Sequence, residues 1–576
     1  MAHADRILRE AAPRPLASPV KSSPVAGSQP NQPLLDPELG RARSRWARGL
    51  GLLRPSHAHS AFSATVLLMA LGFLSRIMGL VRTKYIAWLF GHNTDAFYAA
   101  FQLPDMVSYF LVGGALSATL VTILTRYRDN GREAEGERSL SVILTTMALV
   151  LGSAIVAAEF FAPLYVRHMF HGFDANKAQL CVRLTRILLP AQLCFFASGV
   201  FGAVLFVRKQ FTVPGIAPLI YNLGTIAGGL LLIKHMGISS LAVGTVAGAF
   251  LGNFLLNAVF VYRAGLRFRP ILDWRDEGLR EWVRLSLPLI VGASLVSVDP
   301  WIISYFASSS DGAITLMNVA KQLFAAPIAI LAGAAGMASM PFFASLWSSQ
   351  RHYEFATGVA DSVARVAALG LLAASAMAAL AAPLVELIYL GGRFSAADCR
   401  VCAAYFVIFS LSLFLWSAQA IYSRAFYAAG NTLIPMVAAT SVTLASIPIY
   451  GLFYHWQGAL GLAIASDLGI GMQAVSLAVL LHWRRMVSLA DLDFAEMGRC
   501  LLAAVASGAG AWMVVWSLSV LPGYLWGSLQ PAQIHWTDLM LLVLGTAVWV
   551  VVARWVLEKT GSALPRVTMQ RLGLHR

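Results

Sequence analysis

Fourteen long apolar segments restrict the fold of this chain more than any other feature. An α-helix needs about 20 apolar residues to cross the hydrocarbon core of a bilayer. The segments lie at approximately 62–90 (broken), 95–124, 139–161, 184–207, 213–233, 239–262, 284–307, 313–346, 358–390, 401–427, 433–453, 458–482, 498–521 and 537–557. Charged residues make up only 12% of the 576 residues, against about 25% in soluble proteins. The sequence therefore predicts an all-α integral membrane protein with about 14 transmembrane helices.

The basic residues are unevenly distributed between the loops. With the N-terminus placed inside, and with cations near a span end counted with the adjacent loop, the cytoplasmic segments hold 31 of the 43 Lys and Arg residues, the outer loops hold 7, and the spans hold 5. This bias follows the positive-inside rule, and it predicts cytoplasmic N- and C-termini. It also accounts for the net charge of +15 without a nucleic-acid partner. We expect contact with membrane phospholipid instead.

An internal repeat divides the apolar region. At an offset of 221 residues, Val213-Pro214 meets Ile434-Pro435 and Gly237 meets Gly458. Each unit contains six spans, so the two units enter the membrane in the same direction, which is an architecture of transporters. The predicted organisation is a disordered basic cytoplasmic tail (1–60), an N-terminal six-helix lobe (61–270), a C-terminal six-helix lobe (271–490), two additional transmembrane helices (491–560) and a cytoplasmic tail (561–576).

Charged residues within the first span are candidates for function. Arg76, Arg82 and Lys84 lie within nine residues of one another, and a charge near the middle of a membrane helix costs about 2.5–3.5 kcal/mol. Arginine forms bidentate hydrogen bonds with phosphate, so these cations could form a cavity for a pyrophosphate. The alternative is structural pairing with Asp95 or Asp105.

A second set of polar residues lies in later spans. Lys321 and Gln322 occupy the eighth span, and we expect Lys321 to face the same cavity as the first-span arginines. Asp299 in the seventh span could pair with Lys321. Asp95 begins the second span, where it could cap a helix or pair with the arginines.

Other motifs favour structural roles. The Gly244-x3-Gly248-x3-Gly252 stripe is typical of close helix packing. Cys399 and Cys402 form an isolated C-x-x-C, and His168 with His171 favours a solvated loop over a metal site. The chain contains no phosphate-binding loop, nucleophile elbow or H-E-x-x-H motif. We therefore expect no cofactor, no metal and no enzymatic activity.

Several motifs resemble a known family. They are Ser75-Arg76-Ile77-x-Gly79-Leu80-x-Arg82, Thr94-Asp95-Ala96-Phe97, Phe101-x-Leu103-Pro104, Phe211-x-x-Pro214-x-x-Ala217-Pro218-x-x-x-Asn222, Gly391-Gly392-Arg393-Phe394-Ser395-x-x-Asp398 and Arg424-Ala425-Phe426-Tyr427-Ala428-x-Gly430-Asn431-Thr432-x-x-Pro435. Together they resemble the MurJ (MviN) lipid II flippases of the MOP exporter superfamily, over about residues 60–555.

The resemblance implies a function. Such proteins move an undecaprenyl-pyrophosphate-linked glycan lipid, the peptidoglycan precursor lipid II, across the bacterial cytoplasmic (inner) membrane by alternating access. A cationic central cavity takes the pyrophosphate-sugar headgroup, and the two additional helices form a groove for the lipid tail. Arg76, Arg82 and Asp95 match family positions, and with Lys321 and Gln322 they are the candidate substrate-binding residues. We expect a monomer.

The chain departs from the family at four positions of this region. Ser108-Tyr109, Gly113 and Thr83 stand where the family has charged residues, and Gln322 aligns with a family arginine. The alternatives are therefore a flippase for another polyprenyl-pyrophosphate-linked glycan, a drug exporter of the MATE type, and a non-transporting scaffold for cell-envelope assembly. An integral-membrane transferase is a further alternative.

Overall fold

The computed structural model describes residues 61–111, 116–291, 295–525 and 531–564. The chain divides into two units, Met1–Arg54 and Pro55–Arg576, and every described residue belongs to the second. The predicted tail at 1–60 and most of the predicted tail at 561–576, from residue 565 onward, lie outside the described residues. The described part is helical throughout, apart from loops and one isolated bridge between Gly391 and Phe394.

The helices of the first half share a pattern of long spans interrupted by short breaks. They are α3 (Ala61–Phe90), α4 (Asp95–Ala100), α5 (Gln102–Leu111), α6 (Leu116–Asp129), α7 (Glu133–Met169), α8 (Ala175–Leu188), α9 (Ala191–Val207), α10 (Thr212–Met236), α11 (Ser239–Gly248), the π-helix η1 (Ala249–Leu256) and α12 (Asn257–Arg263).

The second half repeats this pattern. Its elements are α13 (Glu277–Val291), α14 (Leu295–Ala307), α15 (Ala313–Ile328), the π-helix η2 (Ala329–Gly333), α16 (Ala334–Ser348), α17 (His352–Ala379), α18 (Ala381–Tyr389), α19 (Ala396–Leu411), α20 (Leu413–Ala428), α21 (Leu433–Gln457) and α22 (Ala459–Trp483). A short 3₁₀-helix η3 (Leu489–Asp491) then leads to α23 (Phe494–Leu525) and α24 (Pro531–Lys559).

The repeat predicted from the sequence is confirmed by the bounds of these elements. Helix α10 and helix α21 are both 25 residues long, and each bound of α21 lies 221 residues after the matching bound of α10. Both helices end at a glycine with positive φ, 53° at Gly237 and 59° at Gly458. Helices α8 and α19 begin after side-chain caps at Asp174 and Ser395, which also differ by 221 residues.

Each of the fourteen expected spans coincides with a helix or a run of broken helices, but the count of fourteen continuous spans is not confirmed. In the described residues, ten helices are long and apolar enough to cross a membrane, or eleven if the bent pair α19 and α20 is one span. Of the other expected spans, 62–90 is the continuous 30-residue helix α3 rather than the broken segment expected, and 95–124 and 284–307 are divided into pieces such as α5 and α14, which have 10 and 13 residues. These pieces are shorter than the roughly 20 residues that a span needs.

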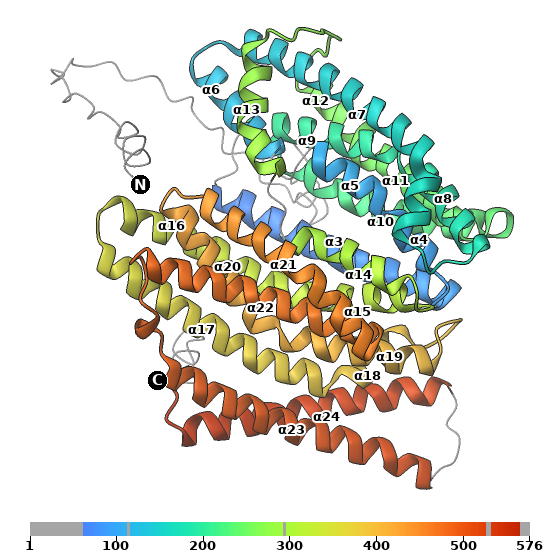
Figure 1. Ribbon diagram of the computed structural model, residues 1–576, viewed down its shortest axis with the longest axis vertical. Helices are drawn as coiled ribbons and strands as arrows, with labels where there is room; N and C mark the ends of the chain where they lie inside the picture. Colours follow the sequence, from blue (N-terminus) through green and yellow to red (C-terminus); the bar gives the residue numbers. More distant parts are fainter. Residues whose placement is uncertain (1–60, 112–115, 292–294, 526–530, 565–576) are drawn as a thin grey trace, which may run out of the picture. The chain divides into compact units, whose positions relative to one another are not determined.

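The helices form two groups, one with most of the first half together with α13, and the other with most of the second half (Figure 1). Helix α3 packs against α10 of the first half and against α15 and α18 of the second. Helix α13 packs against α5, α6 and α7, whereas α14 packs against α21 and α22, so these two consecutive helices belong to different groups. Helices α23 and α24 pack against each other and against α17 and α18.

Close packing within the first half depends on the glycine stripe, as predicted. A Cβ atom on Gly228 of α10 would lie 2.7 Å from the carbonyl oxygen of Ser240 and 2.8 Å from the amide nitrogen of Gly244 on α11. Small residues at a helix interface let the backbones approach this closely.

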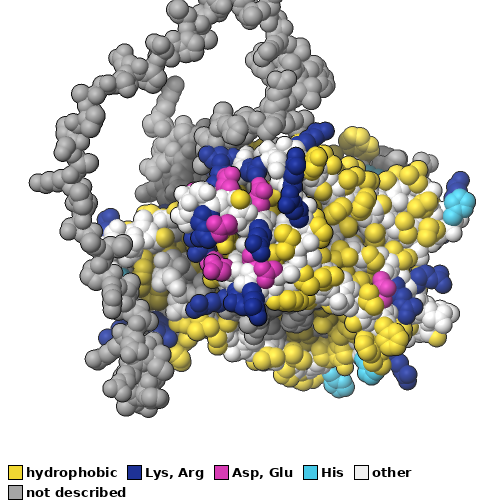
Figure 2. All heavy atoms as spheres, turned by 90° about the horizontal axis from the view of Figure 1, so that it is seen from above, with side chains coloured by type: hydrophobic (Ala, Val, Ile, Leu, Met, Phe, Trp, Pro, Cys, Tyr) yellow, Lys and Arg dark blue, Asp and Glu magenta, His cyan; other side chains and the backbone are white. Residues whose placement is uncertain are grey.

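Apolar side chains cover the outside of the helices. Figure 2 shows hydrophobic side chains across the face of α7 and its neighbours, with charged side chains gathered toward the ends. Phe160 is 77% exposed and Leu231 is 76% exposed. Large exposed apolar side chains on helices of this length are expected where lipid replaces water.

Candidate functional site

A cavity of about 350 Å³ lies between the two halves. Its lining comes from α3, α4, α5, α10 and α11 on one side and from α14 and α15 on the other. The lining residues are Arg82, Thr83, Ile86, Phe97, Tyr98, Phe101, Gln102, Asp105, Tyr109, Tyr221, Thr225, Thr245, Ser297, Pro300, Trp301, Asn318 and Gln322. The wall is thus a mixture of aromatic rings and amide or hydroxyl groups. Among these residues, Arg82 is the one cation and Asp105 is the one carboxylate.

The contacts of Arg82 leave part of its guanidinium available to bind a ligand. Its Cζ atom lies 5.8 Å from the centroid of the Tyr221 ring on α10, a cation–π arrangement. Its Nε atom is buried and has no hydrogen-bond partner among the described residues. A buried donor without an acceptor costs about 1–3 kcal/mol, so an anionic oxygen bound at this point would relieve that penalty.

Arg76 lies elsewhere on the same helix. Six residues of α-helix correspond to about 9 Å along the axis and a large rotation about it, so Arg76 and Arg82 point in different directions. Arg76 is exposed, and its Nη1 atom donates a hydrogen bond of 3.3 Å to the carbonyl oxygen of Ala325 on α15. It connects the halves and is absent from the lining of the cavity.

Lys321 and Gln322 are adjacent on α15, but their side chains point in different directions. Gln322 lines the cavity, and its Nε2 atom would lie only 3.1 Å from a Cβ on Gly79 of α3. Lys321 instead forms an ion pair with Asp299 inside the second half. The predicted Asp299–Lys321 pair is confirmed, and the ammonium of Lys321 is thereby neutralised.

The Lys321 ion pair belongs to a larger polar network. The hydroxyl of Tyr450 on α21 donates to the other carboxylate oxygen of Asp299. The ammonium of Lys321 lies 5.1 Å from the centroid of the Phe409 ring on α19. Asp467 of α22 lies within electrostatic reach of Lys321. A charge pair buried among helices needs such additional partners, so the network joins five helices of the second half.

Asp95 lies at one end of the molecule and is 1% exposed. Its carboxylate accepts hydrogen bonds from the amides of Gly312 (2.8 Å) and Thr315 (2.9 Å), and from the hydroxyl of Thr315 (2.7 Å). It also accepts one from Lys177 Nζ (2.9 Å). Asp95 therefore caps α15 of the other half, and it contacts neither Arg76 nor Arg82.

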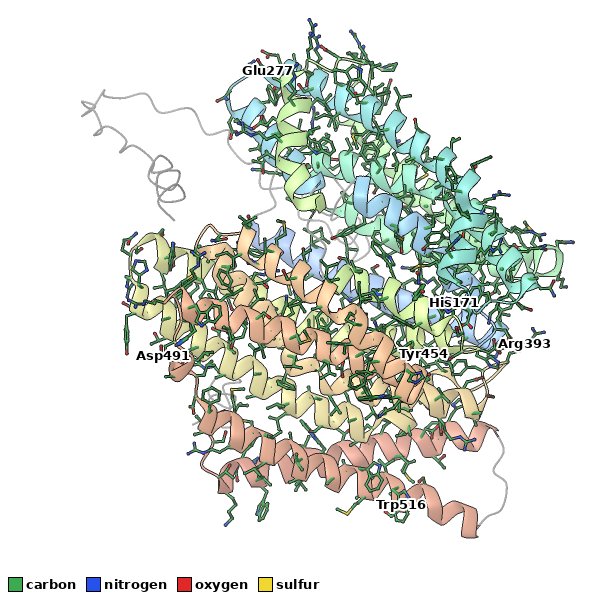
Figure 3. The ribbon with its side chains drawn as sticks, viewed as in Figure 1. His171, Glu277, Arg393, Tyr454, Asp491 and Trp516 are labelled. Atoms are coloured by element: carbon green, nitrogen blue, oxygen red, sulfur yellow. The ribbon has the colours of Figure 1, made fainter. Side chains whose placement is uncertain are left out.

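Lys177 extends this contact, because its Nζ atom also lies 2.7 Å from Asp311. The ion pair with Lys177 holds the pKa of the Asp311 carboxyl below its ordinary value. We call Asp95, Lys177, Asp311, Gly312 and Thr315 the Asp95 cluster. The amide of Arg393 donates 2.9 Å to the carbonyl of Trp88, which adds a second connection between the halves. In Figure 3, His171, Arg393 and Tyr454 lie toward this end, and Glu277 and Asp491 lie toward the opposite end.

Comparisons with known proteins agree with this arrangement. The sequence profile of the family described as "Lipid II flippase MurJ" matches residues 86–529. The chain belongs to the MurJ family. It is 29% identical over 472 residues to a probable lipid II flippase MurJ of Haemophilus influenzae, covering 77% of this chain and 90% of that protein. It is 26% identical to the lipid II flippase MurJ of Burkholderia cenocepacia, covering 74% and 84% of the two chains.

Solved structures share the fold. A lipid II flippase MurJ in an inward closed conformation superimposes with a TM-score of 0.69 at 18% identity, covering 86% of this chain and 99% of that one. A multidrug resistance MATE family transporter of the MOP superfamily, in an inward-facing conformation, gives a TM-score of 0.58 at 15% identity and covers 73% and 97%. The MurJ-family chain is thus a multi-pass membrane protein with the fold of the MOP superfamily.

Several residues of this MurJ-family site were missed from the sequence. Tyr221, Lys177 and Thr315 carried no signal, because their partners Arg82 and Asp95 lie more than 80 residues away in the chain.

Proposed function

We propose that this chain moves lipid II across the bacterial cytoplasmic membrane by alternating access, with both termini in the cytoplasm, and that it acts as a monomer and has no enzymatic activity. The observation that carries this proposal is the cavity between the halves, where Arg82 is the one cation of the lining and keeps a buried, unpartnered Nε donor. A pyrophosphate offers the multiple anionic oxygens that a guanidinium binds best.

The remaining polar residues of the cavity suit the sugars of a headgroup. Gln102 and Asn318 come from opposite halves, as do Thr245 and Gln322. Amides and hydroxyls donate and accept hydrogen bonds without adding charge, as uncharged sugar hydroxyls require. Aromatic side chains such as Tyr98 and Trp301 supply flat apolar surfaces beside them.

A second cavity suits a polyprenyl tail. It has a volume of about 530 Å³ and lies between α17, α19, α20 and α23. Its lining includes Leu371, Val407, Phe414, Leu501 and Trp512. No charged residue lines it, so it can hold hydrocarbon at no electrostatic penalty. This cavity supports a lipid-linked substrate over a soluble one.

Alternating access requires contacts between the halves that can separate. The Asp95 cluster joins the halves at the end opposite Glu277 and Asp491, and these two acidic residues lie beside the basic loops. By the positive-inside rule those loops are cytoplasmic, so we assign the Asp95 cluster to the outer side. In this assignment the substrate enters the cavity from the cytoplasm while the cluster keeps the outer side closed. Gln322 lines the wall of this cavity, Arg76 connects the halves outside its lining, and Asp95 controls its outer exit.

Complementation tests the proposal. The chain is expressed in a bacterium depleted of its own lipid II flippase, and growth and the accumulation of lipid II are measured. Wild type should restore growth, and Arg82→Ala should not. Lys84→Ala is the matched control, because Lys84 is an exposed cation two residues further along α3 and does not line the cavity. Membrane insertion of each variant is confirmed by fractionation.

The outcomes discriminate between functions. Rescue by wild type and Lys84→Ala, but not by Arg82→Ala, supports the lipid II flippase and the assigned anion contact. The well-inserted wild type is also tested in a second host, whose codon usage and lipid composition are closer to those of the organism that encodes this chain. Failure in both hosts would contradict the lipid II assignment. The neutral Gln322 in the cavity then favours a flippase for another polyprenyl-pyrophosphate-linked glycan, since the charge of the site would suit a different headgroup.

A further inference from the structure

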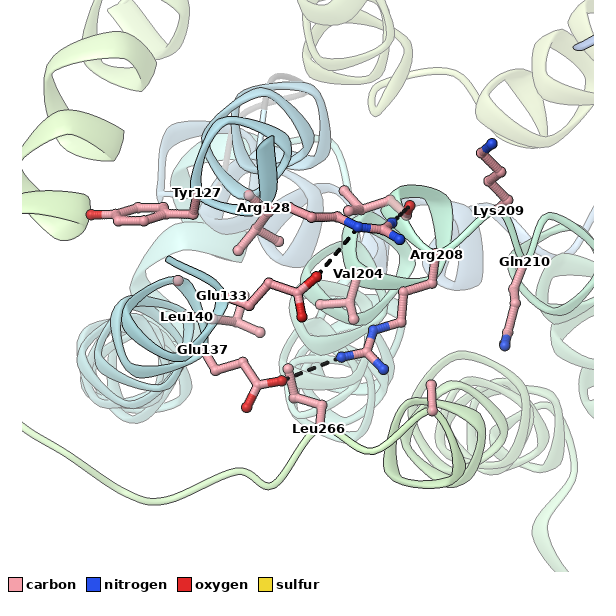
Figure 4. A pocket seen from close by; sticks show the side chains of 14 residues that line it. Tyr127, Arg128, Glu133, Glu137, Leu140, Val204, Arg208, Lys209, Gln210 and Leu266 are labelled. Carbon is pink, nitrogen blue, oxygen red and sulfur yellow. Dashed lines mark hydrogen bonds and ion pairs between the residues drawn. The ribbon is translucent and has the colours of Figure 1, made fainter. Parts of the chain in front are cut away.

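The first half contains another cavity, distant from the one between the halves. It has a volume of about 480 Å³ and lies among the end of α6, the beginning of α7 and the end of α9. Figure 4 shows Arg128, Arg208 and Lys209 around it, with Glu133 and Glu137 on the facing helix. Because helices end and begin here, the cavity lies where a membrane helix meets the aqueous boundary.

The polar groups of this cavity are only partly satisfied. Arg128 contacts Glu133 through Nε at 3.3 Å and donates from Nη1 to the carbonyl of Val207 at 2.9 Å. Arg208 contacts Glu137 through Nη2 at 3.3 Å. A guanidinium has five N–H donors, so both arginines keep donors that these contacts do not use. Lys209 has no carboxylate partner among the described residues, and the Oε1 atom of Gln210 is buried without a hydrogen bond.

The backbone holds Lys209 in an unfavourable conformation. Its φ is 58°, in the left-handed region, which side chains other than glycine rarely adopt. The residue 221 positions later, Gly430, has a φ of 75° at the end of the matching helix α20. The second half thus uses glycine where the first half keeps a lysine, although glycine would be less strained there.

The cavity combines charge with an apolar base. Leu124, Leu140, Val204 and Leu266 contribute apolar surface to the same lining. The three cations and two carboxylates leave one net positive charge. Six further cations around this end of the first half lack a carboxylate partner in the described chain: Arg263, Arg267, Arg269, Arg275, Arg280 and Arg284. The local potential is therefore positive.

We infer that this cavity binds the headgroup of a membrane phospholipid that carries one net negative charge on a phosphodiester, as in phosphatidylglycerol. The free donors of Arg208 and the ammonium of Lys209 would bind the phosphate oxygens, because arginine and lysine are the usual phosphate-binding side chains. The apolar base would contact the glycerol and the first carbons of the acyl chains. Basic pockets between membrane helices on the cytoplasmic side bind lipid headgroups in this way. The inference goes beyond the proposed transport function and does not depend on the identity of the transported lipid.

The test is a binding measurement on the purified full-length protein in detergent. Native mass spectrometry gives the affinity for phosphatidylglycerol, for phosphatidylethanolamine and, by competition, for inorganic phosphate. Two variants change the cavity, Arg208→Gln and Lys209→Asn. Asparagine tolerates the left-handed conformation of position 209, so this variant removes the charge and keeps the helix end. Arg269→Gln is the matched control, because it removes one cation of the same end that does not line the cavity.

We expect wild type to bind phosphatidylglycerol more tightly than phosphatidylethanolamine. Each cavity variant should weaken binding of phosphatidylglycerol by about tenfold or more, the usual effect of losing a charge-assisted hydrogen bond, and Arg269→Gln should leave it nearly unchanged. Equal loss in Arg269→Gln would show that the whole basic surface acts and would overturn the site. Displacement of the lipid by inorganic phosphate at similar concentration would overturn the lipid assignment in favour of a free anion. Unchanged affinity in folded Lys209→Asn would also refute it.

Discussion

Replacing Asp95 by asparagine should open the end of the molecule that the Asp95 cluster closes. Separation of the halves breaks the three hydrogen bonds that the Asp95 carboxylate accepts from Gly312 and Thr315. The fourth bond, from Lys177, joins two residues of the first half and survives the separation. The part of the closing energy that Asp95 supplies is therefore carried by the three bonds between the halves.

The magnitude follows from those bonds. A hydrogen bond to a charged group contributes about 1.5–3 kcal/mol. The single carbonyl oxygen of asparagine can keep one of the three bonds, and its NH₂ group repels the other donors. Losing two bonds at the lower value weakens closure by about 3 kcal/mol, or about 150-fold. A closed population of about 99% would then fall to about 40%.

Distances between spin labels measure this shift. Two exposed positions, one on each half, are His168 at the end of α7 and Ala397 at the beginning of α19. Cysteines at these positions are labelled, and electron paramagnetic resonance gives the distance distribution in nanodiscs. The Asp95→Asn variant should show a new population at longer distance that wild type lacks or holds only in trace.

The matched control is Asp311→Asn. Asp311 belongs to the same cluster and pairs with the same lysine, but its side chain is 73% exposed. An exposed ion pair contributes about 0–1 kcal/mol, so this control should shift the distribution little. An unchanged distribution in a well-folded Asp95→Asn protein, or an equal shift in both variants, would refute the reasoning that the three buried bonds hold the halves together.

Three further predictions concern other contacts. Lys321→Met should lower the amount of folded protein in the membrane, because Asp299 is left buried without its cation at a cost of about 3–5 kcal/mol. Adding Asp299→Asn to this variant should restore much of the folded yield. Fluorescence size-exclusion chromatography measures that yield. Gly228→Val should lower the unfolding temperature, since overpacking costs about 1–3 kcal/mol and the new side chain would meet the α11 backbone, whereas Gly152→Val on α7, where a Cβ meets nothing within 4 Å, should have a small effect. The difference in unfolding temperature between wild type and Asp311→Asn should be the same at pH 5 and pH 8. Lys177 lowers the pKa of the Asp311 carboxyl from 3.8, so the stabilisation by this ion pair is fully present above that pH and is lost only as the pH falls through the lowered pKa.

The helices and their repeat could be predicted from the sequence, because both depend on local patterns. The apolar length of each segment and the spacing of residues such as Pro214 and Pro435 are visible along the chain. The breaks within spans were harder to predict. The interruption after Ala100 and the π-helix that begins at Ala249 lie where the chain packs against other helices, and packing leaves only a weak trace in a single sequence.

The candidate site could be predicted in part. The Asp299–Lys321 pair was accessible because an acid and a cation in neighbouring membrane helices have few other partners. The directions of Lys321 and Gln322 were not accessible, because adjacent residues on a helix differ by about 100° and only the surrounding helices decide which one faces the cavity. The partners of Asp95 lie 217 and 220 residues away, and no local pattern connects them.

The two halves have matching helices but different charge, and this difference locates the anion-binding chemistry in the first half. In the cavity, the guanidinium of Arg82 extends from α3, whereas the second half contributes the neutral Gln322 and Asn318. The cation nearest to them in sequence, Lys321, is neutralised by Asp299. The one carboxylate of the lining, Asp105, also belongs to the first half, so an anion in the cavity is attracted to Arg82 itself rather than to that half as a whole. When the halves separate, the anion should remain with α3, while contacts to the amides of α15 are the ones that change during transport.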